Sequence, residues 1–91
     1  MKMIAAQLLV EEKRVEAALE QARTMLGKAE GRFILDLTPV SRLAARDLRS
    51  LEALAAVADE KSIRIVLRGV GSSVYKVLKL TKLSSRFGFA D

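Results

Sequence analysis

The chain has 91 residues, of which 51% are hydrophobic and 30% are charged, and its formal net charge is +5 at pH 7. A chain of this length forms one domain, expected over residues 1–91, and buries about 60–70% of its unfolded surface, which is enough for one modest core. Cysteine and histidine are both absent. Disulfides and histidine catalysis are therefore excluded, and we expect neither a metal site nor a cofactor.

The start of the chain shows no export signal. A short apolar stretch is followed at once by Glu11 and Glu12, without the cleavage-like end of a signal peptide. No apolar run approaches the length of about 20 residues that spans a membrane. Together with the lack of cysteine, these features predict a soluble, cytoplasmic protein without membrane insertion.

The first third of the chain predicts a short apolar element and a helix. Residues 3–9 suit either a strand or the approach to a helix, because periodicity does not separate the two in so short a run. From Glu11 onward the apolar residues recur at helical spacing. They are Val15, Leu19, Ala22 and Leu26. Gly27 is a suitable terminator, since glycine readily adopts the left-handed cap conformation.

The middle of the chain predicts a strand and a longer helix. Residues 32–37 include three consecutive apolar residues, which is typical of a central strand covered on both faces. Pro39 ends this strand, and Ser41 is the candidate N-cap of a helix running to about Ala58. The small and apolar residues at its start are expected to face inward, namely Ala44, Ala45 and Leu48.

The last third predicts a strand, a loop, a short helix and a short final strand. Residues 63–68 alternate in polarity, and the GVGSS loop at 69–73 ends in a candidate N-cap serine. Val74 and Leu78 mark a helix, and residues 86–90 a final strand. The order (β)αβαβα(β) predicts an α/β fold, in which strands joined through helices lie parallel and cross over with the right hand.

Three features have the appearance of functional motifs but are explained more simply by structure. The GVGSS loop lacks the lysine of a phosphate-binding loop, and a tight turn accounts for it. Asp36, at the end of a strand, is expected to accept hydrogen bonds from loop amides. The lysines of the third helix lack the stacking aromatics of a nucleic-acid site. No acid, base and nucleophile occur together, so we expect neither an enzyme nor a nucleic-acid-binding protein.

An arginine stripe on the second helix is the strongest exposed feature. Arg42, Arg46 and Arg49 follow the spacing i, i+4 and i+7. Like charges at this spacing cost a few tenths of a kcal/mol, which acids in the chain (Asp47 or Glu52) or in a partner would offset. Since residues 61–91 also hold seven basic residues but one aspartate, an acidic partner is favoured, although a solvated basic surface is the simpler interpretation.

Taken end to end, the chain resembles a STAS domain, the module of bacterial anti-sigma factor antagonists. AQLLVEEKRVEAALEQA is similar to the segment entering the first helix of that family, and RFILDLTPV is similar to its central strand. IRIVLRGVGSSVYKVLKLTKLSSRF is similar to the closing strand, loop and helix. The resemblance implies a mixed sheet with helices. It also implies that the first strand of the family is absent here, which leaves a sheet edge that is exposed or pairs with a second copy.

The resemblance also implies a partner-binding site at the loop and helix start after the central strand. The residues of this chain at that site are Thr38, Val40, Ser41, Arg42, Ala45, Arg46 and Arg49. In the family a serine or threonine there is phosphorylated by the anti-sigma factor, a serine-kinase-like ATPase, and the added charge breaks the contact. Ala45 stands at that position and carries no hydroxyl.

The function expected from this resemblance is that of a non-enzymatic protein-binding module in signalling and transcription regulation, without the usual phosphorylation switch. The alternative is an accessory STAS subunit bound to the ATPase of a lipid-trafficking ABC transporter. LRGVGSSVYKVLKL is similar to such subunits, which need no phosphoserine.

Overall fold

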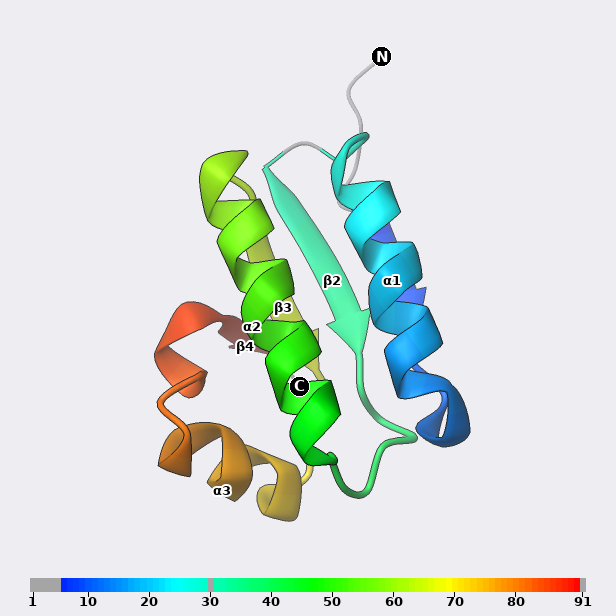
Figure 1. Cartoon of the computed structure of the whole chain (residues 1–91), viewed down its shortest axis with the longest axis vertical. Coiled ribbons are helices and arrows are strands. Elements are labelled where there is room, and N and C mark those ends of the chain that lie inside the picture. Colours follow the sequence, from blue (N-terminus) through cyan, green and yellow to red (C-terminus); the bar gives the residue numbers. More distant parts are fainter. Residues whose placement is uncertain (1–5, 30, 91) are drawn as a thin grey trace.

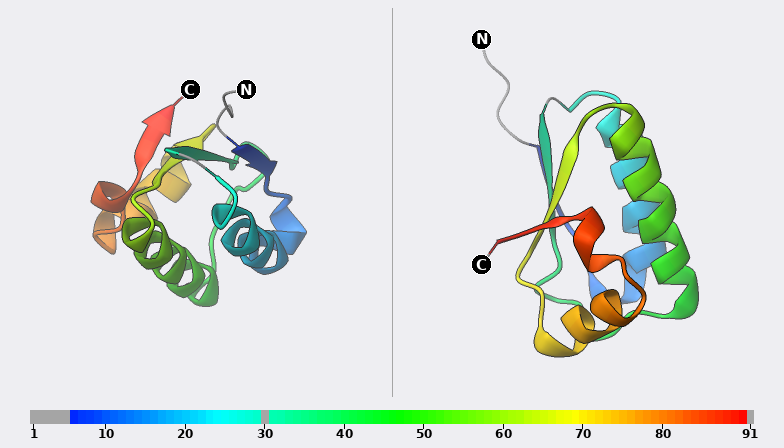
Figure 2. Two further views of the ribbon diagram at one scale, coloured as in Figure 1. Left: turned by 90° about the horizontal axis from the view of Figure 1, so that it is seen from above. Right: turned by 90° about the vertical axis from the view of Figure 1, so that its left-hand side faces the viewer.

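The computed structural model describes residues 6–29 and 31–90 as a four-stranded sheet with helices on one side (Figures 1 and 2). The strands are β1 (Ala6–Leu9), β2 (Arg32–Asp36), β3 (Arg64–Arg68) and β4 (Gly88–Ala90). The helices are α1 (Val15–Leu26), α2 (Ala45–Glu60) and α3 (Ser72–Leu80). Short 3-10 turns precede α1 at Glu12–Arg14 and β4 at Ser84–Arg86.

The sheet has the strand order β1-β2-β3-β4, and all three of its ladders are parallel. Each strand reaches the next through a helix, which is the connection that parallel neighbours require. The predicted α/β class and element order are confirmed. The mixed sheet that the family resemblance implies is not seen, because no antiparallel pair occurs among the described strands. The expected absence of an earlier strand concerns residues 1–5, which lie outside the described residues.

The element predicted within residues 3–9 is a strand over its described part, Ala6–Leu9. It forms one edge of the described sheet, and pairing of this edge with a second copy stays a prediction. No helix among the described residues combines the length and the apolar character that crossing a bilayer would need.

The core lies between one face of the sheet and the helices α1 and α2. Phe33, Leu35, Ile65 and Leu67 are buried on this face. The two helices turn their apolar stripes toward it, with Leu19, Ala22, Leu26, Leu51, Leu54, Ala55 and Ala58 all buried. Burying each large side chain contributes about 1.5–3 kcal/mol.

The prediction that the central strand is covered on both faces is wrong. Ile34 of β2 and Val66 of β3 point away from α1 and α2 and are only half-buried. The views in Figure 2 place both helices on the same side of the sheet. A short apolar run does not by itself distinguish a strand buried on one face from one buried on both.

The second helix begins three residues later than predicted. Its N-cap is Ala44, whose backbone N–H donates to Oδ2 of Asp47 at 2.9 Å. Asp47 thus makes the bond that the N3 residue makes in a capping box, whereas the N-cap residue itself contributes no side-chain bond. Ser41 lies before the helix, and its hydroxyl donates to the Glu12 carboxylate. Ala44 and Ala45 are exposed, so the expected close packing of this pair on the sheet is also wrong.

Two other helix ends differ from the predictions. The third helix begins at Ser72 after the N-cap Gly71, and neither serine of the loop caps it through its side chain. Gly27 ends α1 as predicted, but with a right-handed φ of −63°. The left-handed conformation occurs at Gly31, just before β2, with φ of 77°.

Candidate functional site

The loop after β2 and the first turns of α2 place six of the seven predicted site residues on one exposed surface, which we call the α2-start surface. It consists of Thr38, Ser41, Arg42, Ala45, Arg46 and Arg49, all exposed. The seventh, Val40, is 3% exposed and belongs to the core. Its side chain anchors the loop and offers no contact to a partner.

Asp36 fixes the first part of this loop. Its Oδ1 accepts a hydrogen bond from the Thr38 hydroxyl at 2.6 Å and another from the Thr38 backbone N–H at 2.9 Å. These two bonds, with a smaller effect from the nearby charge of Arg68, hold the pKa of Asp36 below its ordinary value despite the opposing effect of burial. The predicted turn-fixing role of Asp36 therefore has a geometric basis.

Gly69, in the loop after β3, makes room for Thr38. Its φ of 69° lies in the left-handed region, and a Cβ at this position would overlap the Thr38 hydroxyl and approach the Thr38 Cβ to 3.1 Å. Only glycine fits this conformation and this space. The sequence pattern indicates a tight turn at Gly69, and nothing in the sequence pairs it with a residue 31 positions earlier.

The second part of the loop is tied to the 3-10 turn before α1. Glu12 accepts hydrogen bonds from the Ser41 hydroxyl and from the Ser41 backbone N–H, the latter at 3.3 Å. This contact joins segments 29 residues apart in the chain. The hydroxyls of both Thr38 and Ser41 are therefore engaged with carboxylates.

The three arginines differ in their surroundings. Arg46 lies with its Nε 3.7 Å from Oε1 of Glu16 on α1. Arg42 lies in the loop rather than on the helix, so the predicted three-arginine helical stripe is reduced to Arg46 and Arg49. Neither Arg42 nor Arg49 has a carboxylate within ion-pair distance among the described residues. The suggested pairing with Asp47 or Glu52 does not occur, because Asp47 is turned inward as the cap.

Two hollows extend the α2-start surface along the groove between α1 and α2. One, of about 310 Å³, is lined by Arg46, Arg49 and Arg23 together with Glu16 and Glu20. The other, of about 330 Å³, shares Arg46 and Glu16 and continues toward the start of α1. The groove is therefore charged, with basic residues on the α2 side, which suits a polar protein interface better than a small-molecule pocket.

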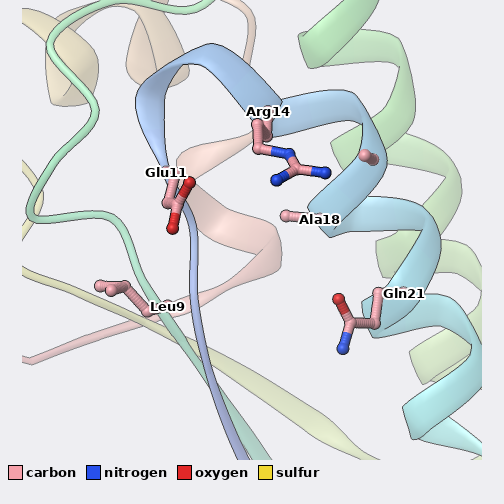
Figure 3. Close-up of a pocket in the computed structure, with 6 residues that line it drawn as sticks. Leu9, Glu11, Arg14, Ala18 and Gln21 are labelled. Carbon is pink, nitrogen blue, oxygen red and sulfur yellow. The ribbon is translucent and has the colours of Figure 1, made fainter.

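A third hollow, of about 220 Å³, lies at the opposite edge of α1. Figure 3 shows its labelled residues, which come from β1, the following turn and α1. They are Leu9, Glu11, Arg14, Ala18 and Gln21. No predicted site residue lines this hollow. Among the described residues, no group of three or more carboxylates lies close enough together to hold a metal ion.

Comparison with solved structures places this geometry in a known fold. The crystal structure of a Thermotoga maritima protein, TM1081, provisionally described as an anti-sigma factor antagonist, matches 99% of this chain and 83% of its own at a TM-score of 0.76 and 15% identity. The NMR structure of TM1081 matches 99% of this chain and 78% of its own at a TM-score of 0.79 and 16% identity.

The likeness shows a shared STAS-like fold. At sequence identities this low, structural similarity is evidence for the fold alone. No family model matches the sequence. No curated protein matches it either.

Proposed function

We propose that this chain is a regulatory protein-binding module of the anti-sigma factor antagonist type, and that the α2-start surface is where its partner binds. The observation that carries the proposal is the pair Arg42 and Arg49, exposed and without a carboxylate partner among the described residues. Arginine is enriched at binding hot spots, where its planar head pairs with carboxylates. The STAS-like fold supports the same assignment.

The arrangement of hydroxyls supports a module that is always competent to bind. Ala45 is exposed in the first turn of α2 and has no group to phosphorylate. The nearby hydroxyls of Thr38 and Ser41 each donate to a carboxylate. A phosphate on either would stand against the charge of Asp36 or Glu12. Binding in this proposal is therefore controlled by the amount of partner rather than by phosphorylation at these positions.

A second candidate is an accessory subunit held on the ATPase of a lipid-trafficking ABC transporter. The observation that favours it is Leu80 at the end of α3, which is 82% exposed and directly follows the basic face of that helix. Its side chain would lose this exposure to water if the end of α3 packed against that ATPase. Here too no phosphorylation switch is required.

Affinity capture distinguishes the two candidates. The tagged protein is incubated with lysate of its native cells, and the bound proteins are identified by mass spectrometry. A kinase-like ATPase or sigma-regulatory protein that is lost with Arg46→Glu/Arg49→Glu supports the first. A transporter ATPase that is lost with Leu80→Glu supports the second. If neither variant changes the set of captured proteins, both the α2-start surface and Leu80 are ruled out as partner contacts.

A further inference from the structure

The face of the sheet opposite α1 and α2 carries an organised set of side chains, of which only Asp36 contributes to the α2-start surface, through its bonds to Thr38. Six residues of the two central strands belong to this open sheet face: Arg32, Ile34, Asp36, Arg64, Val66 and Arg68. They alternate with the buried core residues and so point away from the helices. Figure 2 shows α1 and α2 on the other side of the sheet. No helix or strand among the described residues covers them.

The charges of this face are unbalanced at one end. Arg32 and Arg64 are direct partners in the β2–β3 ladder, and like charges placed opposite each other in a sheet are destabilising. Neither has a carboxylate within ion-pair distance among the described residues. At the other end Arg68 is the ladder partner of Asp36, and its charge adds to the hydrogen bonds from Thr38, which are the main cause of the lowered pKa of Asp36. Arg32 and Arg64 therefore place positive charge at their end of the face without a carboxylate partner among the described residues.

Arg64 extends over β4. A Cβ at Gly88 would lie 3.1 Å from Nε of Arg64 and 3.4 Å from its Nη2. The φ of Gly88 is not positive. Glycine at this position is therefore needed to leave room for the Arg64 side chain and not to allow an unusual backbone conformation. The guanidinium therefore lies over β4, where a Cβ at Gly88 would also meet the Val66 side chain at 3.4 Å, and Arg64 as a whole remains exposed.

We propose that the open sheet face is a second docking surface, and that its occupant is an acidic amphipathic helix of a partner protein. Ile34 and Val66 form a half-buried apolar centre on neighbouring strands, which lie about 4.8 Å apart. A helix about 10 Å wide covers both. Arg64 and Arg68 are four residues apart along β3, or about 13 Å. Carboxylates about nine residues apart on the bound helix therefore reach both ends.

The charge pattern disfavours the other occupants. A second copy of this chain would bring three arginines and one aspartate against the same set. A single-stranded nucleic acid is bound through stacking on aromatic rings, but the open sheet face has none. The aromatic pair Tyr75 and Phe89 is engaged edge to face, with ring centroids 5.2 Å apart.

An NMR titration of the full chain, labelled with ¹⁵N, tests the proposal. The probe is a synthetic peptide of about 14 residues with leucines at i, i+3, i+4 and i+7 and glutamates flanking them. Its control has lysines in place of the glutamates. We expect the glutamate peptide alone to shift amides of β2 and β3. The variant Arg32→Glu/Arg64→Glu should lower the affinity for the glutamate peptide at least about tenfold. The variant Arg46→Glu/Arg49→Glu should lower it by less than about twofold.

Equal binding of the lysine peptide, or shifts confined to α1 and α2, would overturn the proposal. Vesicles containing phosphatidylserine and an oligouridylate RNA are titrated in parallel, and tighter binding of either at this face would replace the peptide as its occupant. If the charge-reversal variant Arg32→Glu/Arg64→Glu does not fold, the neutral variant Arg32→Gln/Arg64→Gln takes its place in the test. This variant should weaken binding of the glutamate peptide at least about tenfold with little change in Tm; unweakened binding of the glutamate peptide would overturn the proposal. Because Arg46→Glu/Arg49→Glu serves here only as a control and the peptide is expected to bind β2 and β3, the result stands or falls separately from the proposed function.

Discussion

Arg46 of α2 and Glu16 of α1 face each other across the groove between the two helices, with 3.7 Å between Nε and Oε1. Both side chains remain largely exposed, at 72% and 59%. The pair lies where the two hollows of the groove meet. A basic group on the proposed partner surface is thus held in place by an acid of the neighbouring helix.

This ion pair is expected to contribute little to stability, which leaves Arg46 available to a partner. A double-mutant cycle with Arg46→Ala and Glu16→Ala, followed by urea unfolding, should give a coupling energy of about 0.2–0.5 kcal/mol, because exposed pairs are screened by solvent and lose side-chain entropy. A coupling well above about 1 kcal/mol would mean that the pair is a structural element of the groove instead.

Asp47 is expected to matter more, because it caps the helix that carries the site. It is only 8% exposed and accepts the Ala44 N–H at 2.9 Å. Asp47→Ala should lower the free energy of unfolding by about 1 kcal/mol, which corresponds to a Tm lower by roughly 4–8 °C. Glu52→Ala, on the exposed side of the same helix, is the control. Equal effects of the two substitutions would rule out the capping role.

Two glycines with similar positive φ angles separate the energetic cost of backbone conformation from that of a steric clash. Gly31 has φ of 77° and a Cβ there would meet nothing within 4 Å, whereas Gly69 has φ of 69° with Thr38 in the way. Gly31→Ala should cost about 1 kcal/mol. Gly69→Ala should cost about 3 kcal/mol, since strain adds to the clash. Thermal unfolding measures both, and comparable losses would contradict the packing of Thr38 on Gly69.

The hydrogen bonds to Asp36 predict a pH-dependent contribution to stability. Since the pKa of folded Asp36 lies below its ordinary value of 3.8, the ionised carboxylate stabilises the native state above about pH 4, and this contribution disappears as the pH falls through the folded-state pKa. Thr38→Val removes the strongest of the bonds and should raise the pKa of Asp36, as read from the pH dependence of its carboxyl ¹³C shift.

Thr81→Val supplies the control for this experiment, because the Thr81 hydroxyl donates to the Val77 carbonyl at 2.9 Å rather than to a carboxylate. Urea unfolding at about pH 6 and about pH 3 should show that the destabilisation by Thr38→Val shrinks in acid while that by Thr81→Val does not. An unchanged difference for Thr38→Val at the two pH values would refute the role of the hydroxyl.

The order of the elements was predictable from the sequence because local signals agree with the final packing. Helical spacing marks α1, Pro39 ends the segment after β2, and the alternation of residues 63–68 matches β3. The start of α2 was not predictable. Ser41 has the chemistry of an N-cap, but Glu12, from 29 residues earlier, accepts its hydrogen bonds. Local propensity does not report such a long-range competitor.

The candidate site was predictable in part. The exposure of Arg46 and Arg49 follows from the helical pattern, whereas burial of Val40 depends on how the loop folds back onto the core. The one-sided covering of the sheet was also hidden, since Ile34 is as apolar as its neighbours. The charged residues of the two strands indicate the uncovered face better, because Arg32 and Arg64 lie on the same face as Ile34 and Val66.

In our proposal the α2-start surface binds a protein partner. Isothermal titration of the captured partner against wild type, Arg46→Glu/Arg49→Glu and Lys61→Glu tests it most directly, because Lys61 carries the same charge at the far end of α2. We expect at least about tenfold weaker binding for the arginine variant and a change below about twofold for Lys61→Glu, with unaltered circular dichroism for both. Wild-type affinity in the arginine variant would contradict the assignment of the surface.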